Sequence, residues 1–185
     1  GGDGDDSLDG GSGNDTFKVT AGTDSIGDLT TGDILVVSTG ATANAINVSS
    51  FVANNLTSNN GTVNLTTLNS DSTINLSSSS AGSYNLVGGS GDDFFIGGFE
   101  DDILYGGPGN DTLSGEVGAD TLNGEGGSDT LLGGSGDDLY VFNSNDVENS
   151  ESITESALGG TDVISIVTTT DFSLMTPSSF DEIEE

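Results

Sequence analysis

Aspartate recurs every nine residues in two parts of this chain, each time after a glycine-rich stretch. Eight nonapeptides share glycine at the first position, aspartate at the sixth and a large apolar or aromatic side chain at the eighth. Two of them cover residues 1–18, and six more run without a break from Gly88 to Val141. The sixth-position aspartates are Asp6, Asp15, Asp93, Asp102, Asp111, Asp120, Asp129 and Asp138. Carboxylates beside flexible backbone supply the oxygens that Ca²⁺ requires, so the repeat predicts calcium sites.

The other positions of the repeat define the turn and the strand that must hold each aspartate. Glycine at the first, second and fourth positions lets the backbone adopt positive φ and direct its carbonyl oxygens toward one point. The three residues after the aspartate are extended, and the middle one points inward. We therefore expect a narrow apolar core that contains Phe95, Leu104, Leu113, Leu122, Leu131 and Tyr140. This pattern predicts an all-β fold, a β-solenoid with a thin core.

The repeat resembles the G-G-x-G-x-D-x-U-x nonapeptide of the RTX (repeats-in-toxin) family. The resemblance implies a parallel β-roll in which two units make one coil, so that each loop stacks on the loop eighteen residues later. It also implies one calcium ion between stacked loops. The earlier loop would give the carbonyls of its second and fourth positions and its aspartate. The later loop would give the carbonyls of its first and third positions and its aspartate.

Carried over to this chain, the resemblance implies about four calcium ions in the array of six repeats. The first site would use Gly89, Gly91, Asp93, Gly106, Pro108 and Asp111; the second would use Gly98, Glu100, Asp102, Gly115, Val117 and Asp120. The third would use Gly107, Gly109, Asp111, Gly124, Gly126 and Asp129; the fourth would use Glu116, Gly118, Asp120, Gly133, Ser135 and Asp138. Asp111 and Asp120 would each be shared between two ions.

Three glutamates depart from the glycine pattern. Glu116 and Glu125 occupy second positions, where we expect a mild effect because the carbonyl is retained. Glu100 replaces the fourth-position glycine, where a side chain at positive φ costs on the order of 1 kcal/mol. We therefore predict that the second site is the weakest.

The opening pair of repeats differs from the long array. Asp6 and Asp15 lie on adjacent loops that would face opposite sides of one coil. We expect neither to have a partner eighteen residues away within this chain. Either preceding sequence or a second copy stacked end to end would then complete their sites.

The remaining sequence falls into two further segments. Residues 19–87 are rich in Ser, Thr and Asn, and contain strand-like runs at 34–38, 46–52, 62–68, 73–76 and 84–87. Residues 77–83, SSSSAGS, fit a flexible linker equally well. Residues 142–185 echo the second segment, because GTD at 22–24 recurs at 160–162 and Thr30, Thr31 and Asp33 recur as Thr168, Thr169 and Asp171. We expect four segments, 1–18, 19–87, 88–141 and 142–185, in a chain that continues in a longer parent.

Composition restricts the partners and the chemistry. The chain has 31 acidic residues and one basic residue, Lys18, which gives a formal charge of −30. Nucleic acid and anionic membranes need Lys and Arg, so we expect neither as a partner, nor membrane insertion. The absence of His, Cys and Arg removes most general bases and nucleophiles, so we expect no enzyme. A glycosidase-type carboxylate pair stays open as an alternative.

These features predict a secreted, calcium-dependent structural protein. Calcium outside the cell would neutralise the acidic turns and fold the chain, whereas low calcium inside would leave it unfolded and exportable. The resemblance to the RTX family implies type I secretion. We expect end-to-end self-association into a surface layer, filament or adhesive matrix. The alternatives are a carrier or secretion module of an RTX enzyme or cytolysin, and a glycan-binding adhesin.

Overall fold

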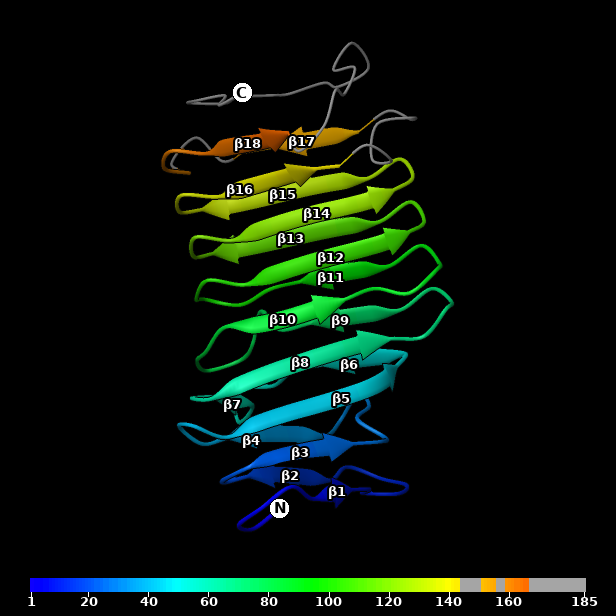
Figure 1. The fold of residues 1–185 in the computed structure, drawn as a ribbon, viewed down its shortest axis with the longest axis vertical. Coiled ribbons are helices and arrows are strands. Elements are labelled where there is room, and N and C mark those ends of the chain that lie inside the picture. Colours follow the sequence, from blue (N-terminus) through cyan, green and yellow to red (C-terminus); the bar gives the residue numbers. More distant parts are fainter. Residues whose placement is uncertain (144–150, 156–158, 167–185) are drawn as a thin grey trace.

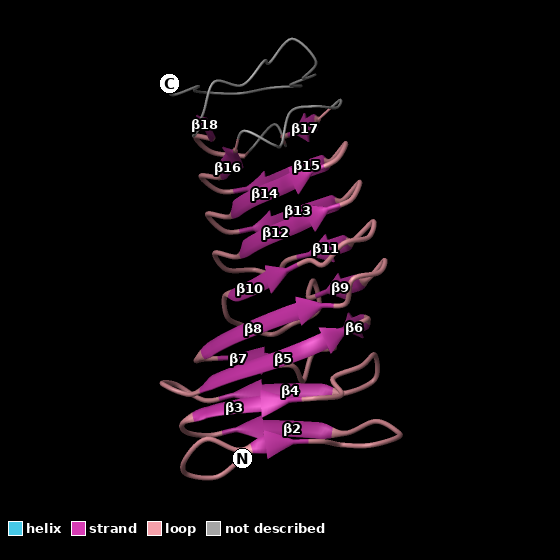
Figure 2. Ribbon diagram, turned by 45° about the vertical axis from the view of Figure 1, so that its right-hand side comes forward, coloured by secondary structure: helices cyan, strands magenta, loops and turns pink. Residues whose placement is uncertain are grey.

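The chain winds into a parallel β-solenoid whose strands stack along its long axis (Figure 1). The computed structural model describes residues 1–143, 151–155 and 159–166. In this part of the chain every strand pairing is parallel and the regular elements are all strands (Figure 2). No helix that could cross a membrane occurs there. The expected all-β solenoid is therefore confirmed.

Three sheets form the walls of the solenoid. The nine-stranded sheet contains β1 (Ser7–Leu8), β3 (Thr23–Ile26), β5 (Thr42–Val48), β8 (Thr62–Thr67), β10 (Tyr84–Val87), β12 (Ile103–Pro108), β14 (Thr121–Gly126), β16 (Leu139–Phe142) and β18 (Val163–Ile166). The six-stranded sheet contains β6 (Ser50–Val52), β9 (Thr73–Asn75), β11 (Phe94–Ile96), β13 (Thr112–Val117), β15 (Thr130–Ser135) and β17 (Ser152–Thr154). The third sheet contains β2 (Thr16–Val19), β4 (Ile34–Val37) and β7 (Ser58–Asn59).

The strand register shows how many residues make one coil. In the long array Ile103 pairs with Thr121, a step of 121 − 103 = 18 residues, and Phe94 pairs with Thr112, a step of 112 − 94 = 18. Two nonapeptides therefore make one coil, as the resemblance implied. The coils between residues 42 and 87 are longer, since Val63 pairs with Tyr84, a step of 84 − 63 = 21, whereas the opening coil also has a step of 25 − 7 = 18.

One apolar row runs through both kinds of coil. Ala45, Leu65, Leu86, Leu104, Leu122, Tyr140 and Ile164 pair in succession across the nine-stranded sheet. All seven are at most 3% exposed. The predicted core residues Phe95, Leu104, Leu113, Leu122, Leu131 and Tyr140 are all completely buried, so this prediction is confirmed.

Most strands predicted between residues 34 and 87 are present within one residue of their expected ends. The run at 46–52 is the exception, because it is divided between β5 and β6, which lie in different sheets. Asn47 has a φ of 60° just before that division. The 77–83 stretch forms no strand, but it packs as a turn in which the buried Ser79 hydroxyl lies 2.5 Å from the Tyr84 hydroxyl.

Candidate metal centre

The nonapeptide loops of the long array stack in two columns. One column precedes the six-stranded sheet and the other precedes the nine-stranded sheet. Loops 88–93, 106–111 and 124–129 precede strands of the six-stranded sheet, and loops 97–102, 115–120 and 133–138 precede strands of the nine-stranded sheet. Backbone pairing continues into the loops, where Gly107 pairs with Glu125 and Glu116 pairs with Gly134. Each loop therefore lies directly on the loop eighteen residues later.

A ladder of aspartates connects the loops of each column. In one column the amide of Asp93 donates to Oδ1 of Asp111 at 2.7 Å, and the amide of Asp111 donates to Oδ1 of Asp129 at 2.8 Å. In the other column the amide of Asp102 donates to Asp120 at 2.6 Å, and that of Asp120 donates to Asp138 at 2.8 Å. All six of these aspartates are at most 2% exposed. The sixth position thus places buried carboxylates at regular intervals along both columns.

The second oxygen of these carboxylates provides the test for a cation. Oδ2 of Asp111, Asp120 and Asp138 is buried and has no hydrogen-bond partner. Burial raises the pKa of each of these three carboxyls to about 7. A buried carboxylate oxygen without a partner is costly unless a positive charge lies beside it. The arrangement fits a hard divalent cation that prefers oxygen ligands, such as Ca²⁺.

The first loop of each column differs from the loops above it. The amide of Gly98 donates to Oδ2 of Asp102 at 2.6 Å, and that of Gly89 donates to Oδ2 of Asp93 at 3.2 Å. Burial raises the pKa of Asp102 to about 6 and also raises that of Asp93. Their Oδ1 atoms accept the amides of Ser72 and Tyr84, so these two carboxylates have backbone donors for both oxygens, whereas Asp111, Asp120 and Asp138 do not.

Glycines form a close cradle around the carboxylates. A methyl group at Gly106, Gly115, Gly124 or Gly133, all first positions, would collide with Oδ2 of the aspartate in the same loop. The carbonyl oxygens of second and fourth positions point toward the loop eighteen residues later. A methyl group added to the glycine at the same position of that later loop would collide with the carbonyl oxygen. These contacts join Gly89 to Gly107, Gly91 to Gly109, Glu116 to Gly134 and Gly118 to Gly136. The stacked loops therefore bring together the carboxylates and several of the carbonyls of the expected ligand sets.

The backbone corrects the prediction about the three glutamates. Glu116 and Glu125 have φ values of 78° and 67°, and with Asn47 they are the non-glycine residues at positive φ in the described structure. Glu100 lies outside that region, so the cost that we expected at its fourth position is absent. Strain falls on the second position instead, because loops 115–120 and 124–129 turn there.

The structure also corrects the prediction for the opening pair. The amide of Asp6 donates to Oδ1 of Asp24 at 3.0 Å, and that of Asp15 donates to Oδ1 of Asp33 at 2.9 Å. The separations are 24 − 6 = 18 and 33 − 15 = 18 residues, so both aspartates have the partner that we did not expect. A rung of the aspartate ladder therefore requires only one acidic side chain in the next coil, and that coil does not have to contain a complete nonapeptide.

The two GTD blocks dock on their nonapeptide loops in the same way. Thr23 and Thr161 donate their amides to Asp5 and Asp137, each at 2.9 Å. Oδ1 of Asp162 accepts the amide of Asp138 at 3.0 Å, as Asp24 does for Asp6. In the other column Glu151 accepts the amide of Asp129 at 3.0 Å. Asp24, Asp33, Glu151 and Asp162 thus join the ladders although we did not predict them, while Thr168, Thr169 and Asp171 lie outside the described residues.

Stacked glycine loops, buried aspartate ladders and an eighteen-residue coil define a calcium-binding β-roll. The family model of the RTX calcium-binding nonapeptide repeat matches residues 1–26, 85–113 and 105–140. These parts of the chain are therefore RTX repeats, and the protein is a calcium-binding repeat protein. No curated protein and no solved structure matches the chain.

Calcium supplies concentrated positive charge between the loops when it is bound. The sixth-position aspartates of the array and the loop carbonyls are the oxygens that would hold the ions. We propose the four ligand sets given above as the residue-level assignment. Asp6 and Asp15 would take part in corresponding sites with Asp24 and Asp33.

Proposed function

We propose that this chain belongs to an extracellular structural protein that folds when calcium binds and then associates end to end. The unpaired, buried Oδ2 atoms of Asp111, Asp120 and Asp138 carry the first part of this proposal. Calcium binding and folding are coupled where ligands come together only in the folded chain. The ladders bring together aspartates from successive coils, so the same loops would bind the ions and hold the coils in place.

Charge supports an assembly that begins after export. The formal charge of −30 opposes compaction, and calcium offsets it at the loops where acids are most closely packed. Calcium is scarce in the cytosol and millimolar outside cells, so weak sites fill only outside. The chain would stay unfolded during type I secretion and form a rigid rod at the cell surface. The chemistry of the loops is then that of structural ligands, with no catalytic role.

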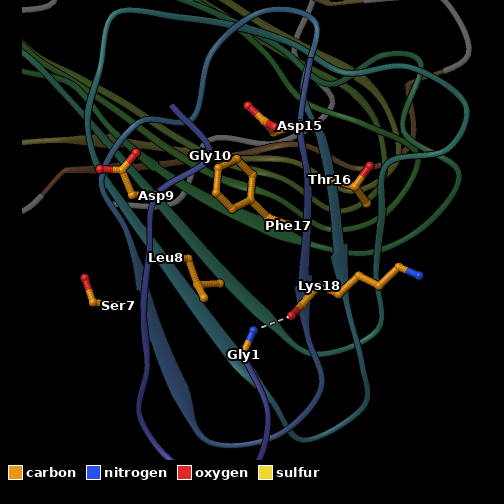
Figure 3. Close-up of a pocket in the computed structure, with 9 residues that line it drawn as sticks. All are labelled: Gly1, Ser7, Leu8, Asp9, Gly10, Asp15, Thr16, Phe17 and Lys18. Atoms are coloured by element: carbon orange, nitrogen blue, oxygen red, sulfur yellow. Dashed lines mark hydrogen bonds between the residues drawn. The ribbon is translucent and has the colours of Figure 1, made fainter. Parts of the chain in front are cut away.

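The N-terminal end of the solenoid supports association between ends. β1 pairs only with β3, and β2 only with β4, so each has one edge without a strand partner in the described structure. Leu8 and Phe17 lie between these strands beside a hollow of about 470 Å³ (Figure 3). A coil of the same kind, from preceding sequence or from another copy, would pair with these open strand edges and complete the sheets.

Circular dichroism and electron microscopy test the two parts of the proposal separately. We expect a β-sheet spectrum with calcium that loses a large part of its intensity in excess EGTA, and we expect ordered filaments or sheets with calcium at high protein concentration. A β-sheet spectrum that EGTA leaves unchanged would refute calcium-coupled folding. A folded protein that stays monomeric would refute the assembly and favour the carrier module of an RTX enzyme or cytolysin.

A further inference from the structure

A cluster of three carboxylates lies where the nonapeptide array ends. Oxygen atoms of Asp138, Glu155 and Asp162 all lie within 4.8 Å of one another. No other group of three or more such side chains meets in this way among the described residues. Asp138 belongs to the last nonapeptide, whereas Glu155 and Asp162 lie beyond the repeats. The cluster is therefore not one of the four sites that the repeat pattern implies.

Asp138 directs an unsatisfied oxygen into this cluster. The side chain is 1% exposed, and its Oδ2 has no hydrogen-bond partner. A methyl group at Gly133 would collide with this oxygen and would lie 2.6 Å from Oε1 of Glu155. The two carboxylates thus converge on the same small space beside Gly133. Oδ1 of Asp162 is oriented by the amide of Asp138.

The backbone register explains how Glu155 reaches this space. Thr154 of β17 pairs with Leu132 of β15, so Glu155 follows at the level of Gly133. A nonapeptide would present glycine at this first position, and here a carboxylate takes its place. The Tyr140 hydroxyl donates to Glu155 and accepts from the Gly133 amide at 2.6 Å, which fixes the carboxylate over the loop.

The cluster also has access to solvent. Glu155 is half-buried and lines a hollow of about 340 Å³ together with Glu116 and Ser135. The N-terminal GTD block offers a comparison, because Asp24 meets Asp6 there but no third acid joins them within the same distance among the described residues. A third carboxylate therefore distinguishes the C-terminal block.

We propose that Asp138, Glu155 and Asp162 bind an additional Ca²⁺ between the last nonapeptide and the sequence that follows it. This inference rests on calcium binding by the loops, which supply the neighbouring ions. Three carboxylates give a formal charge of −3, which favours a divalent ion with oxygen ligands over a monovalent one. The ion would join the last nonapeptide loop to the GTD block and hold the end of the array against fraying.

Counting bound calcium by native mass spectrometry of the full 185-residue chain tests this site. Glu155→Gln keeps the shape of the side chain and removes its charge, and we expect it to lose one calcium ion. Glu125→Gln makes the same charge change outside the cluster, and we expect it to keep the wild-type number. A wild-type number in Glu155→Gln would overturn this proposal alone, whereas no bound calcium in any variant would overturn calcium-coupled folding as well.

The luminescence of Tb³⁺ bound in place of Ca²⁺ gives a second test of the site. A general loss of structure would not produce the pattern of emission losses that we expect. The chain has three tyrosines and no tryptophan, so Tb³⁺ in this site would be excited chiefly through Tyr140. We expect Glu155→Gln and Tyr140→Phe each to remove the same part of the emission, and the double variant to lose no more than either one. Additive losses in the double variant would exclude a site shared by the two residues.

Discussion

The nonapeptide coils of residues 88–141 and the coils of residues 42–87 stack on the same apolar row but differ at their edges. Buried aspartates line both columns of loops in the first region, and several have an oxygen without a hydrogen-bond partner. In the second region neutral side chains join the coils. The side-chain Nδ2 of Asn64 donates to Oδ1 of Asn44 at 2.7 Å, and Nδ2 of Asn85 donates to Oδ1 of Asn64 at 3.2 Å. One fold thus joins its coils through carboxylates that fit bound cations in one part and through neutral hydrogen bonds in the other.

The shared core accounts for the shared fold, and under the proposed function the loops at the edges would set its dependence on calcium. A solenoid coil interacts mainly with its neighbours, so each region can respond to conditions in its own way. Under that proposal the array would need cations to stabilise its carboxylates, whereas the asparagine ladder carries no charge.

The largest expected effect comes from Asp120→Asn, because Asp120 is buried, unpaired at Oδ2 and expected to be shared by two ions. With calcium, we expect the variant to lose about 3 kcal/mol of stability or more, since a ligand to buried cations is lost. In EGTA at pH 8 we expect the opposite sign, a gain on the order of 1 kcal/mol, since a buried charge is removed. Urea unfolding in calcium and the strength of the β-sheet circular dichroism signal that remains in EGTA measure this reversal.

Asp71→Asn is the matched control for that experiment. Asp71 is exposed and accepts the amide of Asp92 at 3.1 Å from outside the array. We expect a change below ~0.5 kcal/mol with or without calcium. Equal effects of the two substitutions would show that the buried ladder has no special relation to calcium.

The pKa values predict a strong dependence on pH. Burial raises the pKa of Asp111, Asp120 and Asp138 from the ordinary 3.8 to about 7. A raised folded-state pKa gives stability that is complete below the unfolded-state pKa and is lost as pH rises through the folded-state value. In EGTA the fold should therefore be more stable at pH 5 than at pH 8, while calcium affinity should fall as pH drops below about 7.

Thermal unfolding in EGTA from pH 5 to pH 8 measures this dependence. We expect Asp120→Asn to reduce the slope, because one of the titrating groups is removed. A slope that the substitution leaves unchanged would assign the pH dependence to the general acidity of the chain.

Backbone strain gives a smaller effect within the array. Glu116→Gly and Glu125→Gly should each stabilise the protein by about 1 kcal/mol, because glycine adopts positive φ without a steric penalty. Glu100→Gly should give no gain, since Glu100 lies outside that region. Urea unfolding in calcium compares the three variants, and a gain at Glu100 alone would support the fourth-position prediction that the structure corrected.

The neutral ladder should give an effect that calcium does not change. Asn64→Ala removes a hydrogen bond on each side of the residue and should cost about 1 kcal/mol. The loss should be the same in calcium and in EGTA. A loss seen only with calcium would mean that the two regions are not stabilised independently.

The sequence predicted what the nine-residue period controls. A fixed period of eighteen residues per coil brings the sixth-position aspartates into ladders and the eighth-position side chains into the core. Leu104 and Leu122, for example, had to stack because they lie eighteen residues apart. The strands between residues 34 and 87 could also be predicted, because apolar residues alternate with Ser, Thr and Asn there.

The sequence did not predict what lies outside that period. Asp24 and Asp33 were missed although they lie eighteen residues after Asp6 and Asp15, because we required a complete repeat. Glu155 and Asp162 could not be placed by counting, since the last coil is longer and Leu139 pairs with Val163, a step of 163 − 139 = 24. The φ values of Glu116 and Glu125 depend on how each loop packs on its neighbours, which residue types alone do not fix.

Hydrogen–deuterium exchange with and without calcium tests the contrast between the two regions most directly. We expect removal of calcium to abolish protection of the amides in strands β12 to β15, while strands β5, β8 and β10 keep a large part of theirs. Equal protection of the array in calcium and in EGTA would refute the conclusion that ions between the aspartate ladders hold these coils together.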